Sequence, residues 1–238
     1  VATPRTRMAM PEISIGLYPD VGGSWLLSRL PGRTGAFLAL TGAHLNAADA
    51  LFAGLADFAV PHERHGALLD GIAAATWTGE READGAQLSH LLEELGEGVE
   101  LPASPLRTHF DRINAVIGHD RLHDIAPRLM ALAEDSDPWL AQAATTFIKG
   151  SPTSAALGLE MQRRARLLSL ADTFRLELQA SVGCCAHSDF AEGVRALLVD
   201  KDKNPRWQPA TLANVTPEWI ADHLRPRFTG GHPLADLK

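Results

Sequence analysis

Cysteine, tyrosine and long apolar runs are scarce in this 238-residue sequence, which has two cysteines and one tyrosine. The two cysteines, Cys184 and Cys185, are adjacent, and adjacent cysteines seldom bridge each other because the geometry is strained. We therefore expect free thiols buried as small apolar side chains, in a reducing, cytoplasmic compartment. No apolar run approaches the roughly 20 residues of a membrane span, so no membrane contact is expected.

An excess of positive charge is also missing. The formal net charge is −7, whereas a general nucleic-acid-binding protein needs a basic surface that neutralises phosphates. A nucleic-acid partner is therefore not expected, although a small basic patch for one phosphorylated ligand is compatible with the charge. The hydrophobic share of 45% and the charged share of 21% are typical of globular proteins, and the length allows a sizeable core.

Metal-ligand clusters are not evident either. His62 and His65, and likewise His119 and His123, have spacings that can hold a metal ion, but no cysteine or further histidine clusters near them in the sequence. We expect surface histidines and no metal site. The sequence also has no Gly-x-Ser-x-Gly elbow of a serine hydrolase and no P-loop lysine spacing.

Strands are scarce, and most of the sequence shows helical periodicity. The strand candidates are 13–17 and 55–60. Helices are predicted over about 24–30, 34–40, 47–53, 63–76, 86–95, 106–117, 122–133, 138–148, 153–168, 170–186, 188–199 and 217–225. The acidic stretch 79–105, broken by glycine and proline, is the best candidate for an insertion or mobile loop. The chain alone therefore predicts a mainly α protein, either a helical assembly or helices whose sheet is not in this chain.

Local signals fix some of the predicted helix ends. Ser24 is expected to cap the first helix, with Leu26 among its inward-facing residues. Asn46 is expected to cap the third helix, and Gly42 and Gly54 are expected to lie just past the ends of the second and third.

Two carboxylates, Glu12 and Asp20, lie in the segment 10–24 with apolar residues between them. Each follows a proline, which stiffens the backbone, and Asp20 precedes a Gly-Gly helix start. A rigid and partly apolar setting is what tunes the pKa of a general acid or base. Two such carboxylates could divide the work, one activating a water and one orienting it. The alternative is that Asp20 only caps the next helix and Glu12 lies on the surface.

Three ordered blocks extend beyond this pair. The first holds Pro11-Glu12, Ile15-Gly16, Gly22-Gly23, Leu30-Pro31-Gly32, Leu40-Thr41-Gly42, Ala47-Ala48-Asp49-Ala50 and Ala53-Gly54-Leu55. The others are 151–154 (Ser-Pro-Thr-Ser) and 188–207, from Ser188-Asp189-Phe190 to Pro205-Arg206-Trp207. In this order they resemble the crotonase (enoyl-CoA hydratase/isomerase) superfamily. Tyr18-Pro19-Asp20-Val21-Gly22-Gly23 resembles its 3-hydroxyisobutyryl-CoA hydrolase branch, because ordinary hydratases have a small residue in place of Asp20.

The resemblance implies the C-terminal part of an α/β crotonase spiral fold, with 1–61 as the end of the core and 62–238 as a helical C-terminal region. It matches Glu12 to the family's catalytic glutamate and Asp20 to the second acidic residue of the hydrolase branch. Glu12 would activate water against a thioester carbonyl or attack it directly, and Asp20 would orient the water or the substrate's 3-hydroxyl. Lys201 or Lys203 would approach a phosphate of coenzyme A, with a solvated charged turn as the alternative.

The departure from the family pattern lies before Glu12. The superfamily stabilises the charge on the thioester oxygen with two backbone N–H groups from Gly-rich segments that precede the Pro-Glu pair. No Gly-Gly-Asp or Gly-Gly-Gly stretch precedes Glu12 here. We expect that N-terminal crotonase segment, with most of the parallel strands, to come from chain outside this sequence, and this chain alone to be poorly active or inactive.

The predicted function is hydrolysis of an acyl-CoA thioester of the 3-hydroxyisobutyryl-CoA type, in the breakdown of branched-chain amino acids such as valine. Coenzyme A is part of the acyl-CoA substrate, and no separate cofactor is expected. One alternative is an enoyl-CoA hydratase or isomerase of the same fold, against which Asp20 argues. A second is an inactive helical fragment or interaction module. Homo-oligomer formation is left open.

Overall fold

The computed structural model describes residues 1–119 and 121–238, which form two compact units. The first unit consists of Val1–Met8 and His44–His109, and the second of Ala9–Ala43 and Phe110–Lys238. The predicted boundary between the end of the crotonase core, 1–61, and the helical C-terminal region, 62–238, stays a prediction, and residue 61 lies inside the first unit. The N-terminal residues belong to the first unit because they pair with residues that follow Ala43.

The described residues are mainly helical, as the sequence predicts, and the two strands among them have two residues each. The α-helices are α1 (Gly23–Leu27), α2 (Thr34–Thr41), α3 (Ala47–Phe52), α4 (His65–Ala74), α5 (Arg81–Gly96), α6 (Pro105–Thr108), α7 (Phe110–Ile117), α8 (Leu122–Met130), α9 (Pro138–Lys149), α10 (Pro152–Ala165), α11 (Leu170–Ala186), α12 (Ser188–Val194) and α13 (Pro217–His223). The 3-10 turns are η1 (Glu12–Ile15), η2 (His62–Arg64), η3 (Ala131–Glu134) and η5 (Leu212–Asn214), and the π-helical turn η4 covers Arg195–Val199. None of the helices described is both long and apolar enough to span a membrane.

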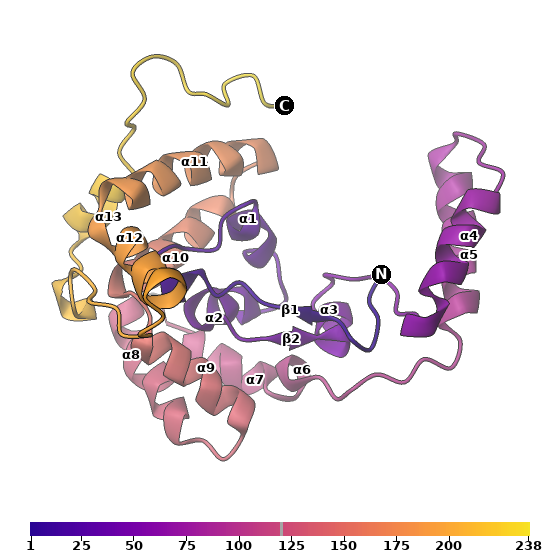
Figure 1. Cartoon of the computed structure of the whole chain (residues 1–238), viewed down its shortest axis with the longest axis horizontal. Helices are drawn as coiled ribbons and strands as arrows, with labels where there is room; N and C mark the ends of the chain where they lie inside the picture. Colours follow the sequence, from indigo (N-terminus) through magenta and orange to yellow (C-terminus); the bar gives the residue numbers. More distant parts are fainter. Residues whose placement is uncertain (120) are drawn as a thin grey trace. The chain divides into compact units, whose positions relative to one another are not determined.

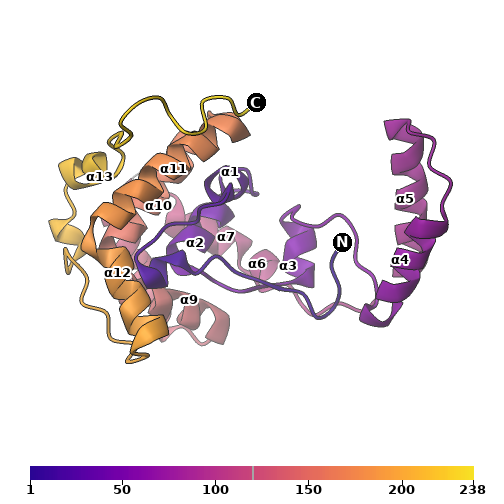
Figure 2. The ribbon, with the colours of Figure 1, turned by 45° about the horizontal axis from the view of Figure 1, so that its top comes forward.

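The first unit combines a minimal sheet with a helical hairpin. β1 (Arg7–Met8) pairs antiparallel with β2 (Leu45–Asn46), and Ala2 forms a parallel bridge with Ala59. Helices α4 and α5 run side by side (Figures 1 and 2). Between them lies a small apolar core of Val60, Leu68 and Leu92, with Phe58, Ile72, Leu88, Leu91 and Leu95 packed against it.

Asn46 caps α3 as predicted and forms a capping box with Asp49. The Asn46 side chain accepts the Asp49 N–H at 3.0 Å, and the Asp49 carboxylate accepts the Asn46 N–H at 2.9 Å. Asp49 is fully buried, and it also accepts the Ser104 hydroxyl at 2.6 Å and the Leu106 N–H at 2.9 Å. This carboxylate therefore joins the start of α3 to the start of α6.

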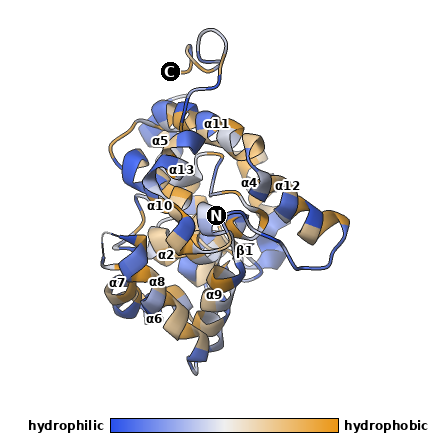
Figure 3. Cartoon of the chain, turned by 90° about the vertical axis from the view of Figure 1, so that its left-hand side faces the viewer, coloured by the Kyte–Doolittle hydropathy of each residue, from blue (hydrophilic) through white to orange (hydrophobic). Residues whose placement is uncertain are grey.

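The second unit packs around α2, which is buried over most of its length and contacts α1, α7, α9 and α10. Gly35 permits the close approach of α1, because a Cβ at this position would overlap the carbonyl group of Leu27. Along α11, hydrophilic and hydrophobic residues alternate (Figure 3), as in an amphipathic helix. Its buried face joins a core of Tyr18, Leu157, Met161, Ala180, Cys184 and Leu224.

Three expectations about local structure are wrong. The stretch 13–17 is not extended, because Glu12–Ile15 forms the 3-10 turn η1, which ends at Gly16 in the left-handed conformation with φ 74°. The stretch 55–60 makes only the Ala2–Ala59 bridge. Most of 79–105 is the 16-residue helix α5 rather than a loop, because its leucines pack on α4 despite the acidic composition. The prediction of Gly42 at the end of α2 is confirmed.

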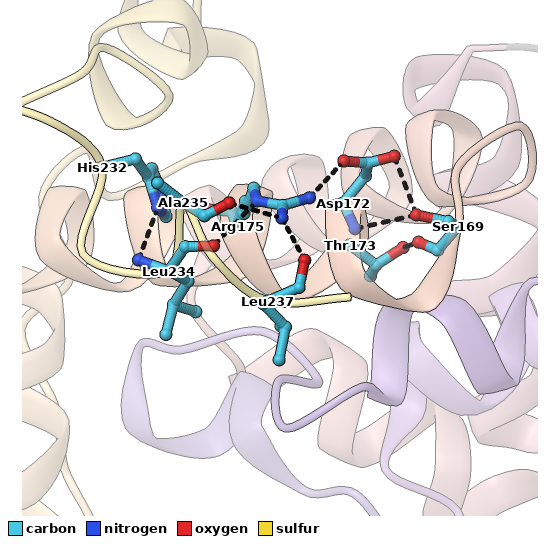
Figure 4. Close-up of polar contacts among 8 residues, drawn as sticks. All are labelled: Ser169, Asp172, Thr173, Arg175, His232, Leu234, Ala235 and Leu237. Carbon is cyan, nitrogen blue, oxygen red and sulfur yellow. Dashed lines mark hydrogen bonds and ion pairs between the residues drawn. The ribbon is translucent and has the colours of Figure 1, made fainter.

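The C-terminal tail is attached to α11 through Arg175 (Figure 4). The guanidinium donates to the backbone carbonyls of Leu234 at 2.9 Å and Ala235 at 3.1 Å, and also to that of Leu237. A pair with Asp172 at 2.6 Å orients it. One arginine side chain thus holds three carbonyl groups of the tail.

Two glycines allow η1 and α12 to pack backbone against backbone. A Cβ on Gly16 would overlap the carbonyl of Asp189, and a Cβ on Gly193 would overlap the backbone of Ile15. Since Gly16 also has a positive φ, no other residue fits there without strain. This contact fixes the turn that begins with Glu12.

We predict that Gly16→Ala lowers the free energy of unfolding by about 2–3 kcal/mol, because overlap and left-handed strain add. Urea denaturation measures the change. The matched control is Gly158→Ala on α10, where the new methyl would meet only ordinary contacts at 3.8 Å and stability should not fall. Equal stability of the two variants would contradict the close packing of η1 on α12.

Candidate active site

Glu12 is the first residue of η1, and its carboxylate is partly withdrawn from solvent. Its Oε2 atom is buried and accepts no hydrogen bond from any described residue. Burial raises the pKa of Glu12, its own backbone N–H opposes the rise, and the charge of Asp20 adds to it. A buried oxygen without a partner costs stability, so such atoms call for an explanation.

The backbone on both sides of Glu12 is firmly held. The Ser151 N–H donates to the Ile13 carbonyl at 3.0 Å, and the Ser151 hydroxyl donates to the buried Asp189 at 2.6 Å. Asp189 also accepts the Gln208 N–H at 2.7 Å. The second and third blocks of the sequence, 151–154 and 188–207, therefore meet at η1 and fix the turn that carries Glu12.

Asp20 lies at the end of a short segment that leads into α1. Its carbonyl accepts the Gly23 N–H at 2.7 Å, and the two residues between them, Val21 and Gly22, have φ values of 50° and 84°. Partial burial raises the pKa of Asp20, and its own backbone opposes the rise. The negative charge of Asp20 also raises the pKa of Glu12, so ionisation of Asp20 disfavours ionisation of Glu12.

A third carboxylate, Glu177 on α11, contacts the backbone just after Asp20, and the sequence did not identify it. It is 3% exposed and accepts the N–H groups of Gly22 at 2.7 Å and Ser24 at 3.0 Å. Burial raises its pKa, the two N–H groups oppose the rise, and Asp20 adds to it. Its helical spacing from the apolar Ala180 and Cys184 is a signal that could have placed it on the buried face.

These contacts decide the alternatives left open by the sequence. No side chain of Asp20 or Ser24 caps α1, and the carboxylate of Glu177 accepts the N–H groups of Gly22 and Ser24 instead, so the side-chain capping expected for Ser24 and the capping alternative for Asp20 are wrong. The buried Oε2 of Glu12 excludes a purely superficial position for that side chain. Leu26 does not face inward as expected but is exposed, because α1 is only five residues long.

Lys201 and Lys203 lie on an exposed loop organised by Arg195. The guanidinium pairs with Glu192 at 2.8 Å, Asp200 at 2.6 Å and Asp202 at 2.7 Å. Hydrogen bonding to Arg195 lowers the pKa of Glu192 to about 2. Both lysines have positive φ, 57° and 55°, and no hydrogen bond or ion pair in the described chain joins them to Glu12 or Asp20.

Both cysteines are free, as predicted, but only Cys184 is buried. Burial raises the pKa of Cys184 to about 12, so this thiol is protonated at neutral pH. Cys185, expected to be buried as well, is exposed because it follows Cys184 on the helix and faces away from the core.

The sequence and the structure of this chain are both similar to those of known proteins. The sequence matches the family described as Enoyl-CoA hydratase/isomerase over residues 1–224. It is 38% identical over 227 residues to the mitochondrial 3-hydroxyisobutyryl-CoA hydrolase of Gallus gallus, with 95% of this chain and 57% of the relative covered. The human protein of that name is 33% identical over 228 residues, covering 94% of this chain and 57% of the relative.

Two solved structures are also similar. A carnitinyl-CoA dehydratase from Mycobacterium thermoresistibile superposes with a TM-score of 0.79 at 39% identity, covering 94% of this chain and 60% of that one. An enoyl-CoA hydratase from Rhodobacter sphaeroides 2.4.1 superposes with a TM-score of 0.68 at 34% sequence identity, covering 93% of this chain and 60% of that one. The chain therefore belongs to the enoyl-CoA hydratase/isomerase (crotonase) family, and it spans a little over half the length of these relatives. Its helices correspond to the C-terminal helical part of the crotonase fold.

We predict that Asp20→Asn lowers the pKa of Glu12, because it removes the negative charge that disfavours ionisation of the neighbouring carboxyl. Carboxyl-carbon NMR titration of Glu12 in the two proteins measures the shift. Glu160→Gln on α10, where the carboxylate pairs with Arg164 at 2.8 Å, serves as the control and should leave the Glu12 titration unchanged. An unchanged pKa in Asp20→Asn would mean that the two carboxylates do not interact.

Proposed function

We propose that this chain carries the acidic half of the active site of an acyl-CoA thioester hydrolase of the 3-hydroxyisobutyryl-CoA type. The observation that carries the proposal is the buried, unpartnered Oε2 of Glu12, whose pKa is raised by burial and further by the charge of Asp20. A raised pKa suits a group that takes and returns a proton near neutral pH. The similarity to 3-hydroxyisobutyryl-CoA hydrolases at 33–38% identity supports this choice of substrate class.

In the proposed reaction, Glu12 removes a proton from a water molecule whose oxygen attacks the thioester carbonyl. The tetrahedral intermediate collapses, the carbon–sulfur bond breaks, and the thiolate of coenzyme A takes the proton from Glu12. Direct attack by the Glu12 carboxylate is the other route, with water releasing the acyl group afterwards. Asp20 orients the water or the 3-hydroxyl of the substrate.

The charge that develops on the thioester oxygen needs hydrogen-bond donors. We propose that these backbone N–H groups come from an N-terminal crotonase segment outside the given sequence, as the greater length of the relatives suggests. This chain alone would then be poorly active or inactive. The substrate would be a branched-chain intermediate of valine breakdown, and coenzyme A would enter as part of it.

A hydratase is the second candidate, because the similar solved structures are described as a dehydratase and a hydratase. The acidic side chain of Asp20 is the feature that favours hydrolysis. The compartment stays a prediction: the two free thiols favour the cytoplasm, whereas the similar hydrolases are named as mitochondrial. Homo-oligomer formation likewise stays open.

We predict that Glu12→Gln and Asp20→Asn each lower turnover of 3-hydroxyisobutyryl-CoA at least about 100-fold, in the range of acid–base residues. The protein used is this chain together with its upstream coding sequence, and a thiol reagent measures release of coenzyme A. Glu160→Gln is the matched control and should retain turnover. Near-native turnover in both variants, or hydration of crotonyl-CoA without thiol release, would overturn the hydrolase assignment. No reaction of either substrate would favour an interaction module.

For Lys201 and Lys203 we propose contact with a phosphate of coenzyme A, since both ammonium groups are exposed and carry no ion pair among the described residues. The double change to alanine should raise KM for the acyl-CoA about 3- to 10-fold and leave kcat nearly unchanged, because a ground-state charge contact is lost. Steady-state kinetics at two salt concentrations measures both constants. Lys149→Ala is the control. If the double variant has the same KM as the wild-type protein, the loop is only a solvated turn.

A further inference from the structure

Glu177 has no part in the proposed reaction, yet it is a nearly fully buried carboxylate that contacts the backbone just after Asp20. It lies in the middle of α11, whereas the N–H groups that it accepts belong to Gly22 and Ser24, more than 150 residues earlier. A buried charge is costly unless hydrogen bonds satisfy it. Each of the two carboxylate oxygens accepts one N–H group, so both hydrogen bonds are charge-assisted.

The same residue also holds the chain on the other side of Asp20. The Tyr18 hydroxyl donates to the Glu177 carbonyl at 2.6 Å and contacts the Ser181 hydroxyl at 3.0 Å. Tyr18 is fully buried, and the Ser24 hydroxyl donates to the Pro19 carbonyl at 3.1 Å. The Tyr18 side chain before Asp20 is therefore bonded to the backbone of Glu177, and the backbone after Asp20 is bonded to its carboxylate.

The turn that follows Asp20 needs such support. Val21 has a φ of 50°, a left-handed conformation that a β-branched residue adopts only at a cost of about 1–2 kcal/mol. Gly22 continues the turn at 84°, and the first residues of α1 offer no side-chain cap of their own. The carboxylate of Glu177 replaces that cap and also neutralises the positive end of the helix.

We propose that Glu177 is a positioning residue for Asp20: it holds the Val21–Gly22 turn in its left-handed conformation and so fixes the position of the Asp20 carboxylate. The part of this proposal that concerns turnover rests on the proposed function. The part that concerns the turn does not, and it is open to measurement on the chain itself.

The first experiment uses amide NMR of Glu177→Gln. The amide side chain can present an oxygen to only one of the two N–H groups, so at least one of the Gly22 and Ser24 signals should shift upfield and exchange faster with solvent. Glu160→Gln is the matched control and should leave both signals in place. Should Glu177→Gln not fold, Glu177→Asp replaces it, because the shorter carboxylate cannot reach both N–H groups. Unchanged Gly22 and Ser24 amides in the variant would overturn the proposal.

The second experiment measures turnover in the longer protein. Displacement of Asp20 should lower kcat about 10- to 100-fold with a change in KM below about 3-fold, since small misplacements cost rate rather than binding. Adding Val21→Gly to Glu177→Gln should restore kcat at least about 3-fold, because glycine adopts the left-handed turn without the penalty. A purely structural role for Glu177 predicts no such rescue.

The outcomes separate the two proposals. If the wild-type protein releases no coenzyme A but the Gly22 and Ser24 amides respond to Glu177→Gln, the proposed function fails while the turn is still held by Glu177. If wild-type turnover is normal and Glu177→Gln matches it, or if Val21→Gly gives no rescue, the positioning role is wrong and the hydrolase assignment stands.

Discussion

The carboxylate of Glu177 joins the two parts of the second unit that must meet for an acidic site to exist. The two carboxylate oxygens accept N–H groups at the start of α1, and the backbone carbonyl of Glu177 accepts the buried hydroxyl of Tyr18. Without these contacts no side chain of α1 would cap that short helix, and nothing would offset the strain of Val21 at positive φ. A long amphipathic helix near the end of the chain thus determines the shape of a turn near its beginning.

Glu12 is held in a different way, through close backbone packing rather than through a charge. Gly16 and Gly193 let η1 and α12 touch, and Asp189 joins this contact to the start of α10. The rigid turn leaves Oε2 of Glu12 buried without a donor. An unpartnered carboxylate oxygen lowers stability, and proteins tolerate such a cost chiefly where a site uses the group. The proposed hydrolase provides that use.

Local sequence signals predicted the helices and several of their ends, because caps such as Asn46 and terminators such as Gly42 act within a few residues. They also identified Glu12 and Asp20 as a pair. The sequence failed where long-range contacts decide the conformation. The stretch 13–17 is a strand candidate, but Glu12–Ile15 forms a 3-10 turn against α12, and Ser24 resembles an N-cap although Glu177 accepts its N–H group from α11. Neither contact has a local signature, and the pairing of the N-terminal residues with 45–59, which sets the unit boundaries, has none either.

The central claim is that Glu12 and Asp20 face the reacting carbonyl of an acyl-CoA. It is tested most directly by a crystal structure of the longer protein with a ketone analogue of 3-hydroxyisobutyryl-CoA, which keeps the carbonyl but has a methylene group between it and the sulfur and so cannot be hydrolysed. We predict that the acyl carbonyl carbon, or a water in contact with it, lies within hydrogen-bonding reach of Oε2 of Glu12, with the 3-hydroxyl or that water bonded to Asp20. An acyl group bound away from both carboxylates would contradict the claim.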